Sequence, residues 1–483
     1  MAEGIDRREF IRRGAAGFAG AALALRGGDS LGAGAERAEG PLIENVTVAP
    51  RDARTATVRF DIAWDDSWRD KTNHDAAWVF LKVRADGAAE WQHVRLAADK
   101  VLNPTGYGRG EGTPLDFIVP DGDDGFVGLF VRRAAEGKGP LAARGVTAVW
   151  DLTANPGIPK DLKGVSLRPF GIQMVYVAEG PFCLGSGGTE INGFYMYTDG
   201  SQNIQPYRAT RAGAIPTGRR QGALWAWKGA QPEDGGEIPA AFPNGYGAFY
   251  CMKYKVSRTA YADFMNTLTP AQADKHYHPR IVIRSGEAPP YTYVPHKKAD
   301  RFKWGALGLS WADGAAFAAW AGLRPMTELE LEKAVRGPRE PVPDEIGGPS
   351  YWGVTGFDNW DWHAMKLCMQ TERAVTVGNA AGRRFRGTHG RGSLTLPADW
   401  PQEDAVGAGM RCSWWGFHRI HHKELARATM SDSPGYHPMA EDGWWELPRT
   451  RLSDRLYAAL VDAERRPYHQ WRAVRAAPKG VGD

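Results

Sequence analysis

One short stretch, "LSWADGAAFAAWAGLRPMTELELEKAVRGP", constrains the fold more than any other part of the chain, because it encodes two separate short helices. Ser310 with Asp313 three residues later predicts the first helix start, since the two side chains can cap the opening turn. Gly322 predicts its end. The inner face of this helix is expected to carry Phe317, Trp320 and Ala321.

A second helix is predicted to begin within five residues of the first one's end. Pro325 disfavours a helical conformation at Arg324, so "LRPM" should cross in extended form. Thr327 with Glu330 then forms another capping pair, and Gly337 ends the helix. Its inner face is expected to carry Leu331, Ala334 and Val335. Helices this short, each capped by its own sequence, are expected to hold loops together in a loop-rich scaffold rather than to cover a large sheet.

Residues 41–155 predict an all-β domain. In "TATVRFDIAW" the residues Val58, Phe60, Ile62 and Trp64 alternate with polar residues, which is typical of a half-buried strand. Further strand-like runs are "IENVTV", "AWVFLKV", "WQHVRL", "LDFIV", "FVGLFVRR" and "VTAVWDL". Seven runs with turn residues between them predict a β-sandwich of immunoglobulin or fibronectin type, a spacer or docking module. "TANPGIPKDLKG" is interpreted as a Pro/Gly linker.

Residues 1–40 are interpreted as an export signal. Arg7 and Arg8 precede an apolar run from Gly14 to Leu25, which is too short to span a bilayer, and Ala33 and Ala35 give an A-x-A cleavage site. This order resembles a twin-arginine signal, which exports folded proteins. We therefore expect a mature chain without a transmembrane segment, in the periplasm or outside the cell.

The amino-acid composition limits the classes of partner that the chain is expected to bind. The net charge of +4 is small for 483 residues and the basic residues are dispersed, so nucleic-acid binding is not predicted. Nineteen tryptophans indicate aromatic core packing, with a platform for sugars or peptides as the alternative. The cysteines allow zero, one or two disulfides, and no C-x-x-C spacing occurs; they are Cys183, Cys251, Cys368 and Cys412.

The second unit, residues 165–478, begins with "FGIQMVYVAEGPFCLGS", a predicted strand, turn and strand. Ser257 is expected to cap a helix bearing Tyr261, Phe264, Met265 and Leu268 on one face, and Thr269–Pro270 to start another. The blocks "MVYVAEGPFCLGS", "FYCMKYKVSRTAYADFMN", "LSWADGAAFAAWAGLRPMTELELEKAVRGP", "RTRLSDRLYA" and "WRAVRAAP" resemble, in order, the formylglycine-generating enzyme (sulfatase-modifying factor) family. The resemblance implies a loop-rich α+β fold of C-type-lectin-like type, but not activity.

The same resemblance implies where chemistry should lie. Active members bind Cu(I) through two C-terminal cysteines and oxidise a sulfatase cysteine to formylglycine; soft thiolates suit Cu(I). The matching block here, "GMRCSWWGFHRIHH", holds Cys412, and no cysteine follows it. The usual pair is absent, and pairing with Cys368 would not be the family's arrangement. Cys412 is the catalytic candidate, and the ligand-binding candidates are Arg411, Ser413, Trp414, Trp415, Arg451, Asp454 and Arg455.

The sequence evidence for two possible metal sites is weaker than that for Cys412. The G-N-x-W-E block that binds calcium in active relatives is replaced here by Met369, Gln370, Thr371 and Glu372, which weakens the case for calcium. His418 and His422 are four residues apart, a spacing that suits a metal on one helix face, with His421 and His437 nearby. We favour a solvated segment with incidental histidines. "HGRGS" and "GSGGTE" lack the context of a phosphate-binding loop.

Two functional hypotheses follow. The first is an exported family member without the copper pair, a binding or assembly protein for a peptide, protein or glycan ligand outside the cytoplasm. The second is an oxidase that converts a sulfatase cysteine to formylglycine, or another metal-dependent oxidase, with a rearranged site at Cys412. The missing copper cysteine favours the first. Twin-arginine export, often used by cofactor-loaded proteins, favours the second.

Overall fold

The computed structural model describes the chain in thirteen parts, which together define the fold. They are residues 40–120, 125–190, 192–199, 205–226, 236–296, 308–345, 349–357, 372–378, 380–411, 451–455, 458, 461–465 and 469–481. Apart from residue 40, the predicted export signal lies outside them. Within these ranges, none of the helices combines the length and the apolar character that a membrane crossing requires.

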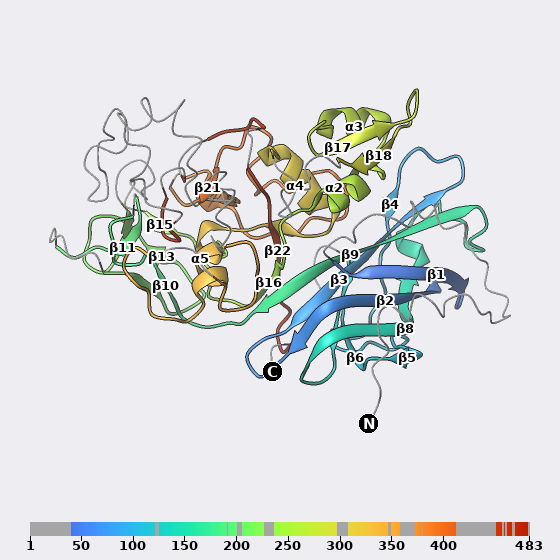
Figure 1. Cartoon of the computed structure of the whole chain (residues 1–483), viewed down its shortest axis with the longest axis horizontal. Coiled ribbons are helices and arrows are strands. Elements are labelled where there is room, and N and C mark those ends of the chain that lie inside the picture. Colours follow the sequence, from blue (N-terminus) through green and yellow to red (C-terminus); the bar gives the residue numbers. More distant parts are fainter. Residues whose placement is uncertain are drawn as a thin grey trace.

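Two sheets pack face to face at the N-terminal end of the chain (Figure 1). The first sheet has the order β1-β2-β8-β5 and consists of β1 (Leu42–Pro50), β2 (Thr55–Arg69), β8 (Gly137–Asp151) and β5 (Glu111–Gly112). Facing it are β3 (Asp75–Ala85), β4 (Gln92–His93), β6 (Leu115–Ile118) and β7 (Leu129–Arg133). Each of the seven predicted runs contains an observed strand.

The alternation predicted for β2 is also observed. Val58, Phe60, Ile62 and Trp64 are buried in the core between the two sheets, whereas Arg59 is exposed. On the facing sheet, Ala77, Val79, Leu81 and Val83 of β3 contribute to the same core. The period of two therefore placed the apolar face of β2 correctly.

The second sheet extends well beyond the N-terminal segment. Its order is β19-β22-β16-β9-β3-β7-β6, with β4 paired to β3. Strand β9 (Val165–Val177) pairs antiparallel with the whole of β3 and, through its C-terminal end, with β16 (Phe249–Met252). Strand β22 (Ala473–Ala476) pairs with β16 and with β19 (Arg324–Pro325). The two units predicted from the sequence therefore share one sheet, in addition to the chain that connects them.

Strand β3 is buried on both faces because it lies inside this shared sheet. Its other face contributes Ala76, Trp78 and Phe80 to a second core, which contains the helices. This explains the apolar run "AWVFL", since a strand covered on both sides has no solvent face to keep polar.

A buried carboxylate holds three of these strands in register. Asp75 accepts hydrogen bonds from Trp64 Nε1 at 2.7 Å and Ser67 Oγ at 3.0 Å, both in β2, and from Gln173 Nε2 of β9 at 2.7 Å. The backbone N–H of Trp68 donates to it at 2.8 Å. Four donors satisfy an otherwise costly buried charge, and they require β2, β3 and β9 to meet at one point.

The helices begin where the sequence predicts. Helix α2 (Arg258–Met265) is capped by Ser257, and α3 (Pro270–His276) by Thr269. Helix α4 (Trp311–Trp320) and α5 (Glu328–Arg336) carry the two predicted capping boxes, and β19 separates them in extended form. Gly322 and Gly337 follow with φ of 71° and 65°, which favour glycine.

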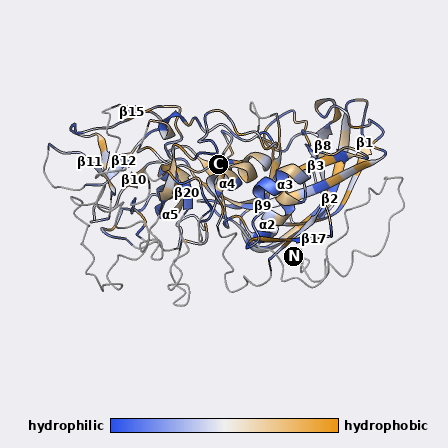
Figure 2. Ribbon diagram, turned by 90° about the horizontal axis from the view of Figure 1, so that it is seen from above, coloured by the Kyte–Doolittle hydropathy of each residue, from blue (hydrophilic) through white to orange (hydrophobic). Residues whose placement is uncertain are grey.

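The rest of the described chain is loop-rich and mostly β. Two-stranded pairs connect its loops: β10 (Phe182–Leu184) with β12 (Tyr207–Ala209), β11 (Phe194–Met196) with β14 (Leu224–Ala226), β13 (Ile215–Pro216) with β15 (Glu237–Ile238), β17 (Val282–Ser285) with β18 (Thr292–Pro295), and β20 (Glu372–Val375) with β21 (Ala408–Arg411). Short 3-10 turns lie at Leu152–Ala154 and Gly382–Arg384. Hydrophobic residues are prominent in the sandwich strands and in α4 (Figure 2).

Candidate functional site

Helix α5 is buried on every side, including its charged residues. All nine residues from Glu328 to Arg336 are buried. The predicted stripe of Leu331, Ala334 and Val335 packs into an apolar core, but it is only part of the buried surface. The remaining faces carry three glutamates, a lysine and an arginine, which need partners because a buried charge without one is strongly unfavourable.

The start of α5 is fixed by its own sequence. Thr327 Oγ1 accepts from the N–H of Glu330 at 3.1 Å, and the Glu330 carboxylate accepts from the N–H of Thr327 at 3.0 Å. Arg324 donates to the same carboxylate through Nη1 at 2.8 Å and Nη2 at 2.5 Å. Acidic side chains in a first turn also interact favourably with the helix dipole. These contacts set the direction in which the other glutamates project.

Glu328 is held by two arginines from distant parts of the chain. Arg455 donates to both of its oxygens, from Nε at 2.7 Å and Nη2 at 2.9 Å. Arg411 Nη1 lies 3.3 Å from Oε2, and the N–H of Val377 donates to Oε1 at 2.8 Å. The side chains of Glu328, Arg411 and Arg455 are 0% exposed.

Glu332, one turn further along α5, has a similar set of partners. Arg411 Nη2 donates to Oε1 at 2.8 Å, and Arg336 Nη1 to Oε2 at 3.3 Å. The N–H of Gly185 donates to Oε2 at 2.7 Å. Burial by itself would raise the pKa of Glu332, but Arg411 and Arg336 outweigh it and hold the pKa below its ordinary value.

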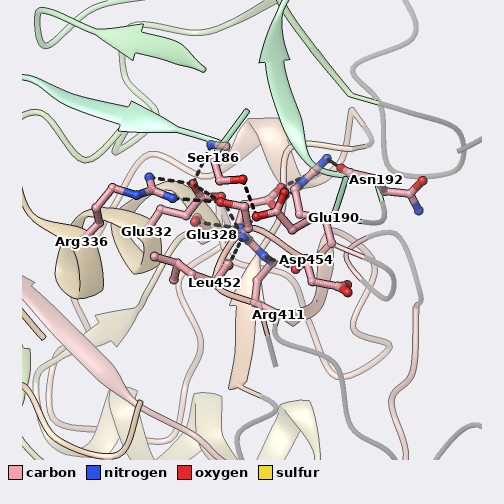
Figure 3. A network of polar contacts seen from close by, with 12 residues as sticks. Ser186, Glu190, Asn192, Glu328, Glu332, Arg336, Arg411, Leu452 and Asp454 are labelled. Atoms are coloured by element: carbon pink, nitrogen blue, oxygen red, sulfur yellow. Dashed lines mark hydrogen bonds and ion pairs between the residues drawn. The ribbon is translucent and has the colours of Figure 1, made fainter. Parts of the chain in front are cut away.

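Arg336 and Arg411 extend this cluster to the loops around it (Figure 3). Arg336 donates to the Glu345 carboxylate at 2.5 Å, the Cys183 carbonyl at 2.5 Å and Ser453 Oγ at 2.9 Å. Arg411, the last residue of β21, donates to the carbonyls of Leu452 at 3.0 Å, Glu328 at 3.1 Å and Asp454 at 3.2 Å. We call Glu328, Glu332, Glu345, Arg336, Arg411 and Arg455 the α5 ionic cluster.

The α5 ionic cluster is balanced in charge, with three carboxylates and three guanidinium groups. Each carboxylate is engaged by an arginine, so none is available as a metal ligand or a proton acceptor. Such a cluster positions the chain segments that enter it. The most direct consequence is at the end of β21, where Arg411 fixes the backbone immediately before Cys412.

One acidic group beside the α5 ionic cluster, Glu190, has a raised pKa, in contrast to Glu332. Glu190 is 3% exposed and accepts a hydrogen bond from Ser186 Oγ. Burial raises its pKa to about 7, and the charges of Asp344 and Glu332 add to the effect. The sequence "GSGGTE" does not predict this state of Glu190, because a single sequence gives no signal that separates a buried loop glutamate from an exposed one.

The comparison with known families supports the resemblance seen in the sequence. Residues 172–381 match the FGE-sulfatase family model, described as the sulfatase-modifying factor enzyme 1-like domain. The chain contains an FGE-sulfatase domain. No curated protein matches the sequence. The match begins inside β9, the strand shared with the N-terminal sandwich, and includes α2 to α5.

The residues predicted to act lie mostly beyond the matched part of the FGE-sulfatase domain. Arg411 and Arg455 belong to the α5 ionic cluster, and Asp454 is 2% exposed and gives its carbonyl to Arg411. Arg451 is different: its Nη1 pairs with Asp344 at 2.6 Å and lies 3.1 Å from Thr189 Oγ1, near the surface. Outside the described residues are Cys368, Cys412, Ser413, Trp414, Trp415, His418, His421, His422 and His437.

The altered calcium block does not provide a cation site in its described part. The carboxylate of Glu372 lies 3.2 Å from Arg472 Nε and 3.5 Å from Lys255 Nζ, and all three residues are buried. Two cations therefore occupy the positions that a calcium ion would need. Across the described ranges no cluster of three or more His, Cys, Asp or Glu residues could hold a metal ion. Met369, Gln370 and Thr371 lie outside those ranges.

The two described thiols of the FGE-sulfatase domain are buried and free. Cys251 lies in β16, between β9 and β22, and burial raises the pKa of its thiol to about 12. Burial also raises the pKa of Cys183, which lies in β10. Because Cu(I) binds thiolates, neither group is suited to a copper site in this conformation.

Proposed function

We propose that the protein is a binding or assembly protein built on its FGE-sulfatase domain and lacking formylglycine-generating activity. Its ligand would be a peptide, protein or glycan outside the cytoplasm, reached by twin-arginine export. The domain would have a C-type-lectin-like arrangement, and the sandwich in front of it an immunoglobulin- or fibronectin-like one. A rearranged oxidase site at Cys412 is the competing function that the experiments below distinguish.

The observation that carries this proposal is the saturation of the α5 ionic cluster. Its arginines and glutamates neutralise one another at 0–2% side-chain exposure, apart from Glu345 at 17%. A reacting site needs at least one group whose charge or proton is uncommitted. A cluster of this kind instead provides a rigid support for loops, which is what a recognition surface on a loop-rich scaffold requires.

The thiols support the same conclusion. Cu(I) chemistry of the family's type needs two thiolates that share the metal. Cys183 and Cys251 are placed in strands and have raised pKa values, so they do not add a second thiolate to Cys412. The family match itself ends at residue 381, before the segment around Cys412.

The loops that the α5 ionic cluster holds in place are where we propose the recognition surface. Arg411 is anchored by Glu332 and by the carbonyls of residues 452 and 454, so the end of β21, which precedes Cys412 in the sequence, is held in place. Arg451 pairs with Asp344 at 2.6 Å and keeps part of its side chain exposed. We therefore place the ligand contact at Arg451 and at Ser413, Trp414 and Trp415, where aromatic side chains would supply most of the contact energy.

The decisive experiment is a mass assay. The mature protein is incubated aerobically with a reductant and a C-x-P-x-R peptide, with and without added copper, beside an active family member as positive control. We expect no mass change in the peptide, and less than one copper per chain in the purified protein. Appearance of the aldehyde product, and its loss in Cys412→Ser, would overturn the proposal in favour of the oxidase.

The binding half of the proposal has its own test. Peptide and glycan arrays probed with the mature protein are expected to give a ligand whose binding is lost in Trp414→Ala and Trp415→Ala. Trp91→Ala is the matched control, because Trp91 lies between Arg84 and Arg168 on the sandwich. Binding that both Trp variants retain would place the ligand elsewhere, and a protein that binds nothing on either array would contradict the binding function.

A further inference from the structure

A cavity of about 280 Å³ lies at the turn between β2 and β3, and no residue of the α5 ionic cluster lines it. It is lined chiefly by Arg69, Lys71, Thr72, His74, Arg132 and Glu136. These residues come from the end of β2, the turn before β3, strand β7 and the connection from β7 to β8. Its volume is near the lower end of the range for small-molecule sites. The function proposed above does not use this cavity.

The turn that forms one wall is rigid. The carboxylate of Asp70 accepts N–H bonds from Thr72 at 2.7 Å and Asn73 at 3.0 Å. Asn73 in turn donates to the carbonyl of Trp352 at 2.5 Å and accepts from Trp68 Nε1 at 3.2 Å. Because the Asp70 carboxylate already accepts two backbone N–H groups, its charge is partly offset, and the wall is attached to both sheets and to the loop that carries Trp352.

The floor of the cavity is a buried arginine beside a buried histidine. The Arg132 side chain is 3% exposed; its Nη1 donates to the carbonyl of Val481 at 2.8 Å and lies 3.2 Å from His74 Nε2. His74 is stacked on Tyr176, and its Nε2 lies 3.0 Å from Tyr250 OH. An arginine this deeply buried at the bottom of a cavity gives it a positive base.

The guanidinium group of Arg69 has N–H donors that make no hydrogen bond within the described residues. Both of its hydrogen bonds, to Asp116 Oδ2 and to the carbonyl of Arg133, are made by Nη1 at 2.8 Å. Within the described residues, Nε and Nη2 make no hydrogen bond, although the side chain is only 18% exposed. Lys71 at the rim also has no ion pair among the described residues. Nε and Nη2 of an arginine form the planar pair of donors that matches the oxygens of a carboxylate or phosphate.

We propose that this cavity binds a small oxyanion, a carboxylate, sulfate or phosphate group, between Arg69, Lys71 and Arg132. Asp116 lies between the two arginines and contacts both through Oδ2, so it offsets only part of their charge. Glu136 is exposed at the mouth, where solvent screens its charge. The ligand's oxyanion would take the unused Arg69 donors and the Lys71 ammonium.

Anion binding in this cavity should be coupled to uptake of a proton by His74. Burial, with Arg132 and Arg69, lowers the pKa of His74 well below its ordinary value, so the ring is neutral at neutral pH. The groups that face it are Arg132 of β7, Arg69 of β2, Tyr250 of β16 and Tyr176 of β9. A bound anion would offset the positive charges of Arg69 and Arg132, and the pKa of His74 would therefore rise. Affinity should therefore increase as the pH falls.

Calorimetric titration of the mature protein with sulfate, phosphate and acetate, each against chloride at equal ionic strength, tests the site. Sulfate stays fully ionised, so its affinity at about pH 6 and about pH 8 reports the protein's proton. We expect one site per chain, with tighter sulfate binding at the lower pH. The anion that binds best identifies the source, and chloride-like behaviour of all three would overturn the proposal.

Variants locate the site. Arg69→Gln should weaken binding about tenfold and Lys71→Gln about fivefold, as the loss of charge-assisted hydrogen bonds predicts. Lys138→Gln is the matched control, since Lys138 is exposed on β8 but does not line the cavity. Lys71 is exposed, so its variant tests the site even if Arg69→Gln does not fold. Equal affinity in Lys71→Gln and the control would contradict the proposed site.

Discussion

Lys82 of β3 donates a hydrogen bond to the carbonyl of Trp320 at 2.8 Å, and this contact joins the sandwich to the last turn of α4. The same amine donates to the carbonyl of Gly392 at 2.6 Å. Trp78 Nε1, also from β3, donates to the next carbonyl of the α4 end, that of Ala321, at 2.8 Å. Burial lowers the pKa of the Lys82 amine well below its ordinary value, so its role at the end of the helix is to donate hydrogen bonds to carbonyls that lack helical partners.

This contact should contribute measurably to stability. Lys82→Met keeps the apolar stem but leaves the Trp320 and Gly392 carbonyls buried without a donor, so we expect a loss of about 2 kcal/mol in the free energy of unfolding. Chemical denaturation measures it, with Lys138→Met on the exposed edge of β8 as the matched control. If both variants unfold at the same denaturant concentration, Lys82 does not cap α4.

Thr327 should behave as a helix N-cap with an additional contact. Its hydroxyl accepts from the N–H of Glu330 and donates to the carbonyl of Pro243 at 2.9 Å. Thr327→Ala should therefore cost about 1 to 2 kcal/mol of unfolding free energy. Thr327→Ser keeps the hydroxyl and should recover most of the loss. An Ala variant as stable as the Ser variant would contradict the capping role.

Removal of Arg411 should be one of the most damaging single changes among the described residues. Arg411→Met leaves Glu328 and Glu332 with one arginine fewer in a fully buried site, and we expect a loss of about 3 to 5 kcal/mol. Combining it with Glu332→Gln should cost less than the sum of the two single changes, because the second change removes one of the two buried carboxylates that lost Arg411 as a partner. Additive losses in thermal or chemical unfolding would argue against direct coupling.

Glu190 should make stability depend on pH. Its pKa rises from 4.5 in the unfolded chain to about 7 in the folded one, so the folded state binds the proton more tightly. The resulting stabilisation is complete below about pH 4.5 and is lost as the pH rises through about 7. Glu190→Gln keeps the acceptor for Ser186 and removes the charge.

We therefore expect Glu190→Gln to match the wild type near pH 4 and to exceed it by about 2 to 3 kcal/mol near pH 8. Denaturation midpoints across this range measure the difference. Glu340→Gln is a suitable control, since Glu340 is an exposed carboxylate paired with Arg208. Parallel pH profiles for wild type and Glu190→Gln would show that Glu190 titrates normally.

Export is expected to depend on the paired arginines. Replacing Arg7 and Arg8 by lysine should retain the full-length precursor in the cytoplasm, whereas the unaltered chain should lose about its first 35 residues. Cell fractionation and mass measurement of the mature N-terminus report both outcomes. Replacing Arg12 and Arg13 by lysine is the matched control, because these arginines follow the pair. Unchanged export of the Arg7 and Arg8 variant would contradict the twin-arginine assignment.

The local structure could be predicted from the sequence alone. The capping pairs at Ser310 and Thr327, the glycine ends of both helices and the alternation in β2 all depend on contacts within a few residues, so their patterns are legible in a single chain. The order of the family blocks also identified the FGE-sulfatase domain, which the match to residues 172–381 confirms. Local chemistry was sufficient for these features.

Which charges are buried, and which strands the two units share, depends on contacts between segments that are distant in the sequence. Glu328 meets Arg455 across more than a hundred residues, and β3 meets β9 across the predicted linker. The helical pattern of α5 gave no sign that its charged faces would be covered, because burial depends on segments remote in sequence. Pairing between distant residues follows from how the whole chain packs, and single-sequence periodicity does not encode it.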